Sequence, residues 1–256
     1  MLARTFSTPL LGIIVSFSLA GCATAPAAPV ESVSAAETPQ AVRGGAVSAA
    51  DPRAQEAGDE ILRKGGSATD AAIAVMLALT VVEPQSSGIG GGGFMVRGAA
   101  DGSVTSYDGR ETAPAGATPD WFLDEDGKVP PFRDSVRSGL SVGVPGNLAL
   151  AAKAHAEHGK LPWAALFRPA IVLAREGFVL NERLHSSLEG QFDRAGHTPE
   201  GRALFYQADG TPRPVGTRIV LPDLAATFER IASAGPQAFY KGDSATALAQ
   251  TIAAET

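Results

Sequence analysis

The sequence predicts a mixed α and β fold in one large domain, and three observations lead to that prediction. Two helix patterns come first, at residues 52–64 and 71–82. A run of glycines then leads into two strand-like segments around a turn at Asp101-Gly102, which predicts a β-hairpin. Helix patterns return at residues 146–158, 163–176, 221–234 and 245–254. With 45% hydrophobic and 19% charged residues, the chain can form a buried core.

The first predicted helix is amphipathic and has recognisable ends. Asp51 is a good N-cap, and Pro52 suits the first helical position because that residue needs no N–H donor. Gly65-Gly66 ends the helix. Its apolar face consists of Ala54, Ala57, Ile61 and Leu62.

The second predicted helix is apolar on every side, so we expect it at the centre of the core. Ser67 to Asp70 match a capping box, which fixes the start of the helix. The apolar run from Ala71 to Val82 is too short to cross a bilayer, and Pro84 ends it.

The glycine-rich loop at residues 88–93 matches the letters of a dinucleotide-binding fingerprint but lacks its context. Gly88, Gly90 and Gly93 satisfy G-x-G-x-x-G, a pattern that needs a strand before it and a helix after it to bind pyrophosphate. Here a helix precedes the loop and a strand follows. Because glycine destabilises regular structure, four in a row indicate backbone packed close to a ligand or to a neighbouring part of the core.

Charge and residue content exclude several kinds of site. A net charge of -6 gives no basic surface for nucleic acid. The single cysteine allows neither an intramolecular disulfide nor a thiolate metal site. His155 and His158 lack a third ligand and indicate a solvated helix end, so we expect neither metal nor cofactor. Four acidic residues lack the spacing of a calcium loop and are interpreted as surface charge: Asp120, Asp124, Glu125 and Asp126.

The N-terminus has the features of an export signal. Arg4 precedes an apolar stretch from Leu10 to Leu19, and residues 1–21 are predicted to form a signal peptide. The sequence Leu19-Ala20-Gly21-Cys22 resembles the lipobox of bacterial lipoproteins, which implies a lipid on Cys22, attachment to the bilayer and a periplasmic location. The alternative is an ordinary signal peptide. Residues 22–41 are expected to be a flexible tether, and residues 42–256 the folded region.

Several short motifs occur in a fixed order along the folded region. They are Gly65-Gly66-Ser67-Ala68-Thr69-Asp70-Ala71-Ala72, Glu83-Pro84-Gln85, Gly90 to Met95, Arg110-Glu111-Thr112-Ala113-Pro114, Val144-Pro145-Gly146, Pro169-Ala170 with Leu173 to Phe178, and Phe239-Tyr240-Lys241-Gly242. Together they resemble the large subunit of the γ-glutamyltransferase, or glutathione hydrolase, family. Each motif alone is weak, but the order and spacing extend the resemblance from Gly44 to Thr256.

The resemblance implies an α+β fold of the N-terminal nucleophile hydrolase type, an αββα sandwich of which only the large-subunit part is present. In that family the precursor cuts itself, and the threonine at the new N-terminus of the small subunit attacks the γ-glutamyl amide. No catalytic residue is therefore expected in this chain. Arg110 matches the arginine that binds the substrate's α-carboxylate; without the resemblance, a surface arginine bonded to Asp108 would be the preferred interpretation.

The chain is therefore predicted to be one of the two subunits of an enzyme. With its small subunit, the chain would cleave γ-glutamyl amides such as glutathione and transfer the γ-glutamyl group to water, amino acids or peptides. Because the last helix pattern continues almost to Thr256 without an end signal, we expect the chain to be truncated and inactive alone. Two alternatives stay open: a non-catalytic lipoprotein that acts as a binding module, and a relative of the cephalosporin acylases.

Overall fold

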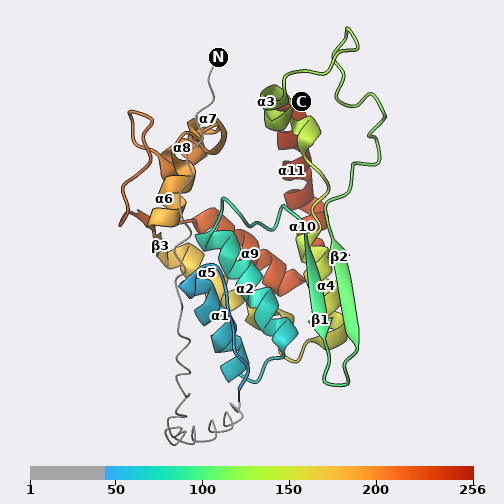
Figure 1. Ribbon diagram of the computed structural model, residues 1–256, viewed down its shortest axis with the longest axis vertical. Coiled ribbons are helices and arrows are strands. Elements are labelled where there is room, and N and C mark those ends of the chain that lie inside the picture. The colour runs from blue at the N-terminus through green and yellow to red at the C-terminus, as the bar shows by residue number, and fades with distance from the viewer. Residues whose placement is uncertain (1–43) are drawn as a thin grey trace, which may run out of the picture. The chain divides into compact units, whose positions relative to one another are not determined.

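The computed structural model describes residues 44–256, and these form one compact unit of helices with two small sheets (Figure 1). The predicted signal peptide, the tether and Cys22 lie outside the described residues. The elements are α1 (Pro52–Arg63), α2 (Ala68–Val82), β1 (Gly93–Gly98), β2 (Val104–Gly109), α3 (Phe132–Arg137), η1 (Gly139–Ser141), α4 (Asn147–His158), α5 (Trp163–Glu176), β3 (Phe178–Val179), α6 (Glu182–Leu188), α7 (Phe192–Ala195), α8 (Pro199–Phe205), β4 (Arg218–Ile219), α9 (Pro222–Ala234), α10 (Gln237–Tyr240) and α11 (Gly242–Ala254).

Both predicted helix starts are confirmed. The Asp51 side chain accepts a hydrogen bond from the backbone N–H of Arg53 at the start of α1. At the start of α2, Ser67 and Asp70 form the reciprocal capping box. Asp70 also accepts hydrogen bonds from the backbone of Lys160 and Leu161, so it joins α2 to the loop before α5.

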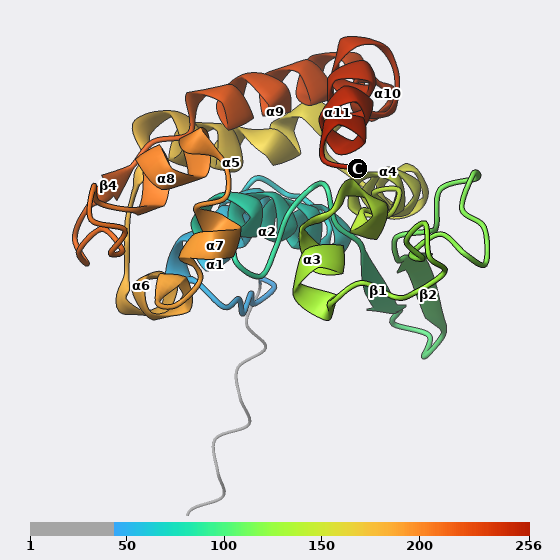
Figure 2. The ribbon, with the colours of Figure 1, turned by 90° about the horizontal axis from the view of Figure 1, so that it is seen from above.

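The helices stack in layers around α2. Figure 2 shows α9 on the outside, α5 beneath it, and α2 with α1 below α5. Phe167 of α5 and Phe228 of α9 meet edge to face with ring centroids 5.9 Å apart, and both are fully buried. The prediction that residues 71–82 are central is confirmed, because ten residues of α2 are buried.

The predicted hairpin is confirmed as an antiparallel pair of β1 and β2, with Met95 opposite Tyr107. Those two side chains pack on α4. On the opposite face of the pair, three apolar side chains are between 69% and 71% exposed: Phe94, Val96 and Val104. The hairpin therefore has one face on the helical core and one uncovered apolar face.

Several short elements were not predicted. They are α3, α6, α7, α8 and α10, with four to seven residues each, and the two-residue strands β3 and β4, which pair with each other. Such short segments show too few repeats of a helix or strand period to be recognised. α11 begins at Gly242, before the predicted start at Ala245, because Asp243 suits the first turn of a helix. Within residues 44–256, no helix combines the length and the apolarity that crossing a membrane requires.

Candidate functional site

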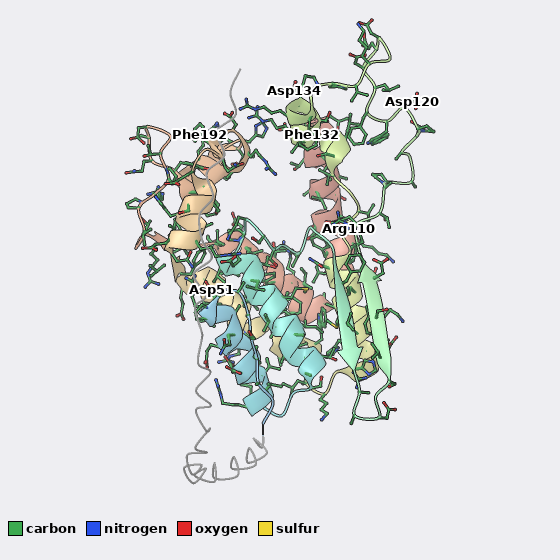
Figure 3. All side chains as sticks on the ribbon, viewed as in Figure 1. Asp51, Arg110, Asp120, Phe132, Asp134 and Phe192 are labelled. Atoms are coloured by element: carbon green, nitrogen blue, oxygen red, sulfur yellow. The ribbon has the colours of Figure 1, made fainter. Side chains whose placement is uncertain are left out.

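Arg110 lies directly after β2, at the end of the hairpin away from its turn (Figure 3). Its guanidinium Nη1 is 2.7 Å from Glu111 Oε2, and its side chain is 66% exposed. Asp108 contacts Arg110 through the backbone, since its carboxylate accepts a hydrogen bond from the Arg110 N–H at 2.9 Å. The surface ion pair with Asp108 considered from the sequence is therefore replaced by a pair with Glu111.

The glycine loop passes against the segment that carries Arg110. A Cβ atom at Gly92 would lie 2.6 Å from the Glu111 nitrogen, the Glu111 Oε2 and the Gly109 carbonyl oxygen. A side chain at Gly92 would collide with backbone that cannot move aside. Gly90, in contrast, has no atom within 4 Å of the same virtual position. The backbone at Gly92 is thus packed against a neighbouring part of the chain, residues Gly109 to Glu111.

The segment before α4 holds the glycine loop from the other side. The backbone N–H groups of Gly146 and Asn147 donate to the Gly91 carbonyl at 3.0 and 3.1 Å. The Asn147 side chain donates to the Gly88 carbonyl at 2.7 Å. Asn147 is buried, and its position at the start of a helix was the only signal for it in the sequence. This network fixes the loop relative to α4.

These parts line a cleft of about 630 Å³, in which polar residues form one side and apolar residues, Phe94 and Val96 among them, form another. Arg110, Glu111, Asn147, Ser86 and Ser87 line it, together with glycines of the loop. The guanidinium is a fork of N–H donors that fits a carboxylate and keeps its charge at any working pH. The cleft can therefore bind a small ligand that carries a carboxylate.

The two histidines considered for a metal have other partners. His155 Nε2 is 2.8 Å from the Leu161 carbonyl oxygen and 3.7 Å from the buried Asp70 carboxylate. His158 packs edge-on against Tyr107. No group of three potential ligands comes together among residues 44–256. Of the acidic residues between the hairpin and α3, Asp124 accepts backbone hydrogen bonds that shape an exposed turn.

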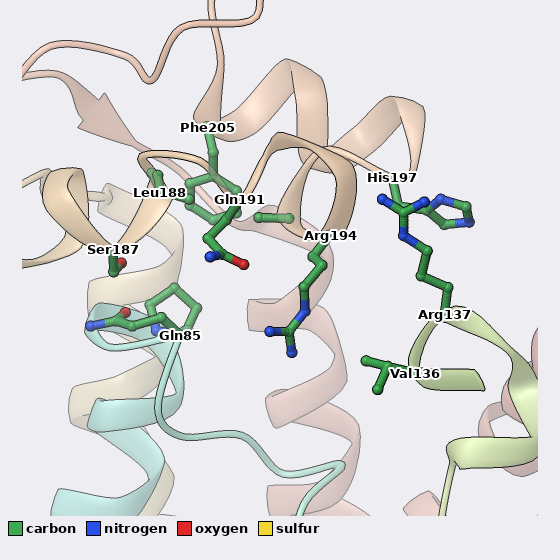
Figure 4. A pocket seen from close by; sticks show the side chains of 11 residues that line it. Gln85, Val136, Arg137, Ser187, Leu188, Gln191, Arg194, His197 and Phe205 are labelled. Atoms are coloured by element: carbon green, nitrogen blue, oxygen red, sulfur yellow. The ribbon is translucent and has the colours of Figure 1, made fainter. Parts of the chain in front are cut away.

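A second cavity, of about 680 Å³, lies between α3 and the helices α6 to α8 (Figure 4). Arg137 and Arg194 enter it from opposite sides, with Gln85 and Gln191 as further polar groups. Arg110 is not among the residues that line this cavity. The two cavities are therefore separate, and of these two only the cleft contains the predicted site residue.

The sequence matches the family model described as gamma-glutamyltranspeptidase over residues 54–256. It is 43% identical to the glutathione hydrolase proenzyme of Bacillus subtilis (strain 168), over 82% of this chain and 36% of that protein. It is 37% identical to the proenzyme of Escherichia coli (strain K12), over 94% of this chain and 42% of the relative. The chain thus spans less than half the length of these relatives.

Solved structures agree with this match. The γ-glutamyltranspeptidase of Helicobacter pylori is 34% identical with a TM-score of 0.77, over 82% of this chain and 60% of that one. The enzyme of Pseudomonas nitroreducens, complexed with L-DON, is 36% identical with a TM-score of 0.75, over 84% and 62%. A cephalosporin acylase from Bacillus halodurans is 29% identical with a TM-score of 0.65, over 79% and 39%.

The structural likeness confirms the predicted α+β fold of the N-terminal nucleophile hydrolase type, of which residues 44–256 form a part. The family model extends over the glycine loop, Arg110 and α4, so the match includes the cleft as well as the helical core. The chain belongs to the gamma-glutamyltranspeptidase family.

Proposed function

We propose that this chain is the large-subunit part of an enzyme that cleaves γ-glutamyl amides such as glutathione. A small subunit from the same precursor would supply an N-terminal threonine, which attacks the γ-amide carbonyl and releases the amine. The resulting acyl-enzyme would pass the γ-glutamyl group to water, an amino acid or a peptide. The family match and the names of the relatives, glutathione hydrolase proenzymes, support this activity.

The observation that carries the proposal is the position of Arg110 in the polar cleft. Its role is to bind the α-carboxylate of the γ-glutamyl group, with Glu111 releasing the guanidinium when the ligand enters. The two carboxylates compete for one cation, so the ligand has to displace Glu111 from Arg110 in order to bind. The described residues place no second arginine or lysine on the cleft wall.

The uncovered hairpin face supports the proposed partner. Phe94, Val96 and Val104 form an apolar surface, and within the described region β1 and β2 pair only with each other. Open strand edges beside an apolar face are the features to which further strands add. We assign this surface to the small subunit, whose strands would extend the hairpin and cover it.

The test replaces the matching segment of the Bacillus subtilis proenzyme by residues 54–256 and assays cleavage of a γ-glutamyl anilide. The chimaera should process itself and be active. Arg110→Ala should raise KM with kcat nearly unchanged. Losing the partner of a desolvated charge pair costs about 2–5 kcal/mol, and the exposure of Arg110 favours the lower end, about thirty-fold in KM.

The matched control is Arg168→Ala. Arg168 is an exposed arginine on α5 and does not line the cleft. This control should keep the KM of the parent chimaera. An unchanged KM for Arg110→Ala would refute the carboxylate role, and a folded, self-processed chimaera without activity would refute the enzymatic one. Cleavage of a cephalosporin amide in preference to the anilide would favour the acylase alternative, which the Bacillus halodurans likeness supports.

A separate proposal concerns location. We infer from the sequence Leu19-Ala20-Gly21-Cys22 that Cys22 carries a lipid and anchors the protein to the bacterial membrane in the periplasm. Expression with radiolabelled palmitate should label the wild-type chain and leave Cys22→Ser unlabelled. Equal labelling of both chains, or none in either, would contradict the anchor and leave an ordinary signal peptide.

A further inference from the structure

We propose that Tyr240 is a positioning residue for Arg110 and acts through the start of α4. The proposal rests on the carboxylate-binding role proposed for Arg110. Tyr240 lies on α10, far along the chain from the hairpin, and its hydroxyl is the point at which α10 bonds to the start of α4. It does not line the polar cleft.

The Tyr240 hydroxyl makes two hydrogen bonds at the start of α4. It donates to the Pro145 carbonyl oxygen at 3.0 Å and accepts from the Ala149 backbone N–H at 3.0 Å. The first N–H groups of a helix have no partner inside the helix, so they need an acceptor from elsewhere. One hydroxyl therefore joins the residue before the helix to its first turn.

The helix cannot cap itself, because its N-cap residue is Gly146. A Cβ at Gly146 would lie 2.0 Å from the Gly109 carbonyl oxygen and 3.2 Å from that of Arg110. Serine, aspartate or asparagine, the usual capping residues, would collide with the Gly109 carbonyl directly before Arg110. The close contact with the Gly109 carbonyl thus requires glycine at this position, and the capping acceptor comes from Tyr240.

The segment from Val144 to Gly146 forms hydrogen bonds with both the Arg110 segment and the glycine loop, which border the cleft. The Val144 N–H donates to the Thr112 carbonyl at 2.8 Å, two residues beyond Arg110. The Gly146 N–H donates to Gly91 of the glycine loop. Burial raises the pKa of Tyr240, so the hydroxyl stays protonated and able to donate through the neutral range. Loss of the hydroxyl would loosen the segment against which the Arg110 backbone packs.

The test compares Tyr240→Phe with Tyr206→Phe in the 256-residue chain. The control also loses one tyrosine hydroxyl, which donates to the Leu188 carbonyl at 3.0 Å in a part of the core that does not line the cleft. Three measurements are made by NMR: amide exchange of Ala149, the position of the Arg110 Nε resonance, and binding of γ-glutamyl methylamide. Tyr240→Phe should speed Ala149 exchange at least about tenfold, shift the Arg110 resonance and weaken binding several-fold. Tyr206→Phe should change none of them.

The outcomes separate the proposal from the function on which it rests. Faster exchange at Ala149 with an unshifted Arg110 resonance and unchanged binding would show a helix cap without a positioning role, and would overturn the proposal. Unchanged amide exchange of Ala149 in Tyr240→Phe would also overturn the proposal, because the hydroxyl would then not stabilise the start of α4. If Arg110→Ala binds γ-glutamyl methylamide as tightly as the wild-type chain, the carboxylate role fails, while the exchange and resonance data still decide whether Tyr240 positions Arg110.

Discussion

Asp70 should be among the most sensitive single positions for stability, and Asp70→Ala is the substitution that tests this. The side chain is fully buried, and one carboxylate oxygen accepts three backbone hydrogen bonds. The donors are the N–H groups of Ser67 at 2.8 Å, Lys160 at 2.9 Å and Leu161 at 3.2 Å. Alanine removes the acceptor for the α2 cap and for the loop before α5 together.

The expected loss follows from the donors that would remain. Hydrogen bonds to a charged group contribute about 1.5–3 kcal/mol each, and a buried donor left without a partner costs about 1–3 kcal/mol. Because the three N–H groups share one oxygen, their contributions do not add fully. We therefore expect Asp70→Ala to lower the free energy of unfolding by about 4 kcal/mol, which lowers Tm by roughly 10 °C in a domain of this size.

Urea unfolding followed by circular dichroism measures the loss. Asp70→Asn keeps one acceptor oxygen and should fall between the wild-type chain and Asp70→Ala. The control is Asp101→Ala. The Asp101 carboxylate accepts two hydrogen bonds from Ser103 in the exposed hairpin turn, so its loss should lower the free energy of unfolding much less. A loss for Asp70→Ala below about 1 kcal/mol, or equal to that of the control, would refute the reasoning.

Three further predictions concern Gly92, Asp51 and Val96. Gly92→Ala should lower the free energy of unfolding by about 1–3 kcal/mol, since its Cβ meets backbone at 2.6 Å, whereas Gly90→Ala should be nearly neutral in the same urea experiment. Burial raises the pKa of Asp51, but the hydrogen bonds and the charge of Arg53 together outweigh it and hold that pKa below its ordinary 3.8. The wild-type chain should be more stable than Asp51→Asn at pH values above the ordinary pKa of Asp51. This advantage should vanish as the pH falls through the lowered pKa, and thermal unfolding at stepped pH measures it. Val96→Lys should leave the fold intact but abolish co-purification with the small subunit that we propose as the partner, and retained co-purification would contradict the proposed assignment of this surface.

Features that depend on neighbouring residues could be predicted from the sequence. Asp51 and Ser67 were recognised as caps because capping acts within one helical turn. The turn at Asp101-Gly102 was recognised because a tight turn has its own residue preferences, and Gly102 does adopt a positive φ of 84°. In each case the cause and its structural result lie within a few residues of each other.

Features that depend on distant residues could not be predicted in this way. Asp70 was identified as a cap, but nothing near it in the sequence indicates its bonds to Lys160 and Leu161. Tyr240 is part of a motif, yet its bond to the start of α4 appears only when the helices are packed. Arg110 was identified through a family resemblance, and its present partner, Glu111, became clear only from the geometry.

The close packing around Arg110 explains why motifs so far apart in the sequence occur together in one protein. The glycine loop, the Arg110 segment, the Val144-Pro145-Gly146 turn and Tyr240 form one bonded unit, in which each member leaves its neighbour little freedom. A side chain at Gly146 would collide with the Gly109 carbonyl directly before Arg110, and the lack of one makes a distant cap necessary. The motifs therefore specify a single local geometry. The short helices α6 to α8, by contrast, place no residue on the cleft wall, so we expect substitutions of their exposed residues to affect stability more than ligand binding in the cleft.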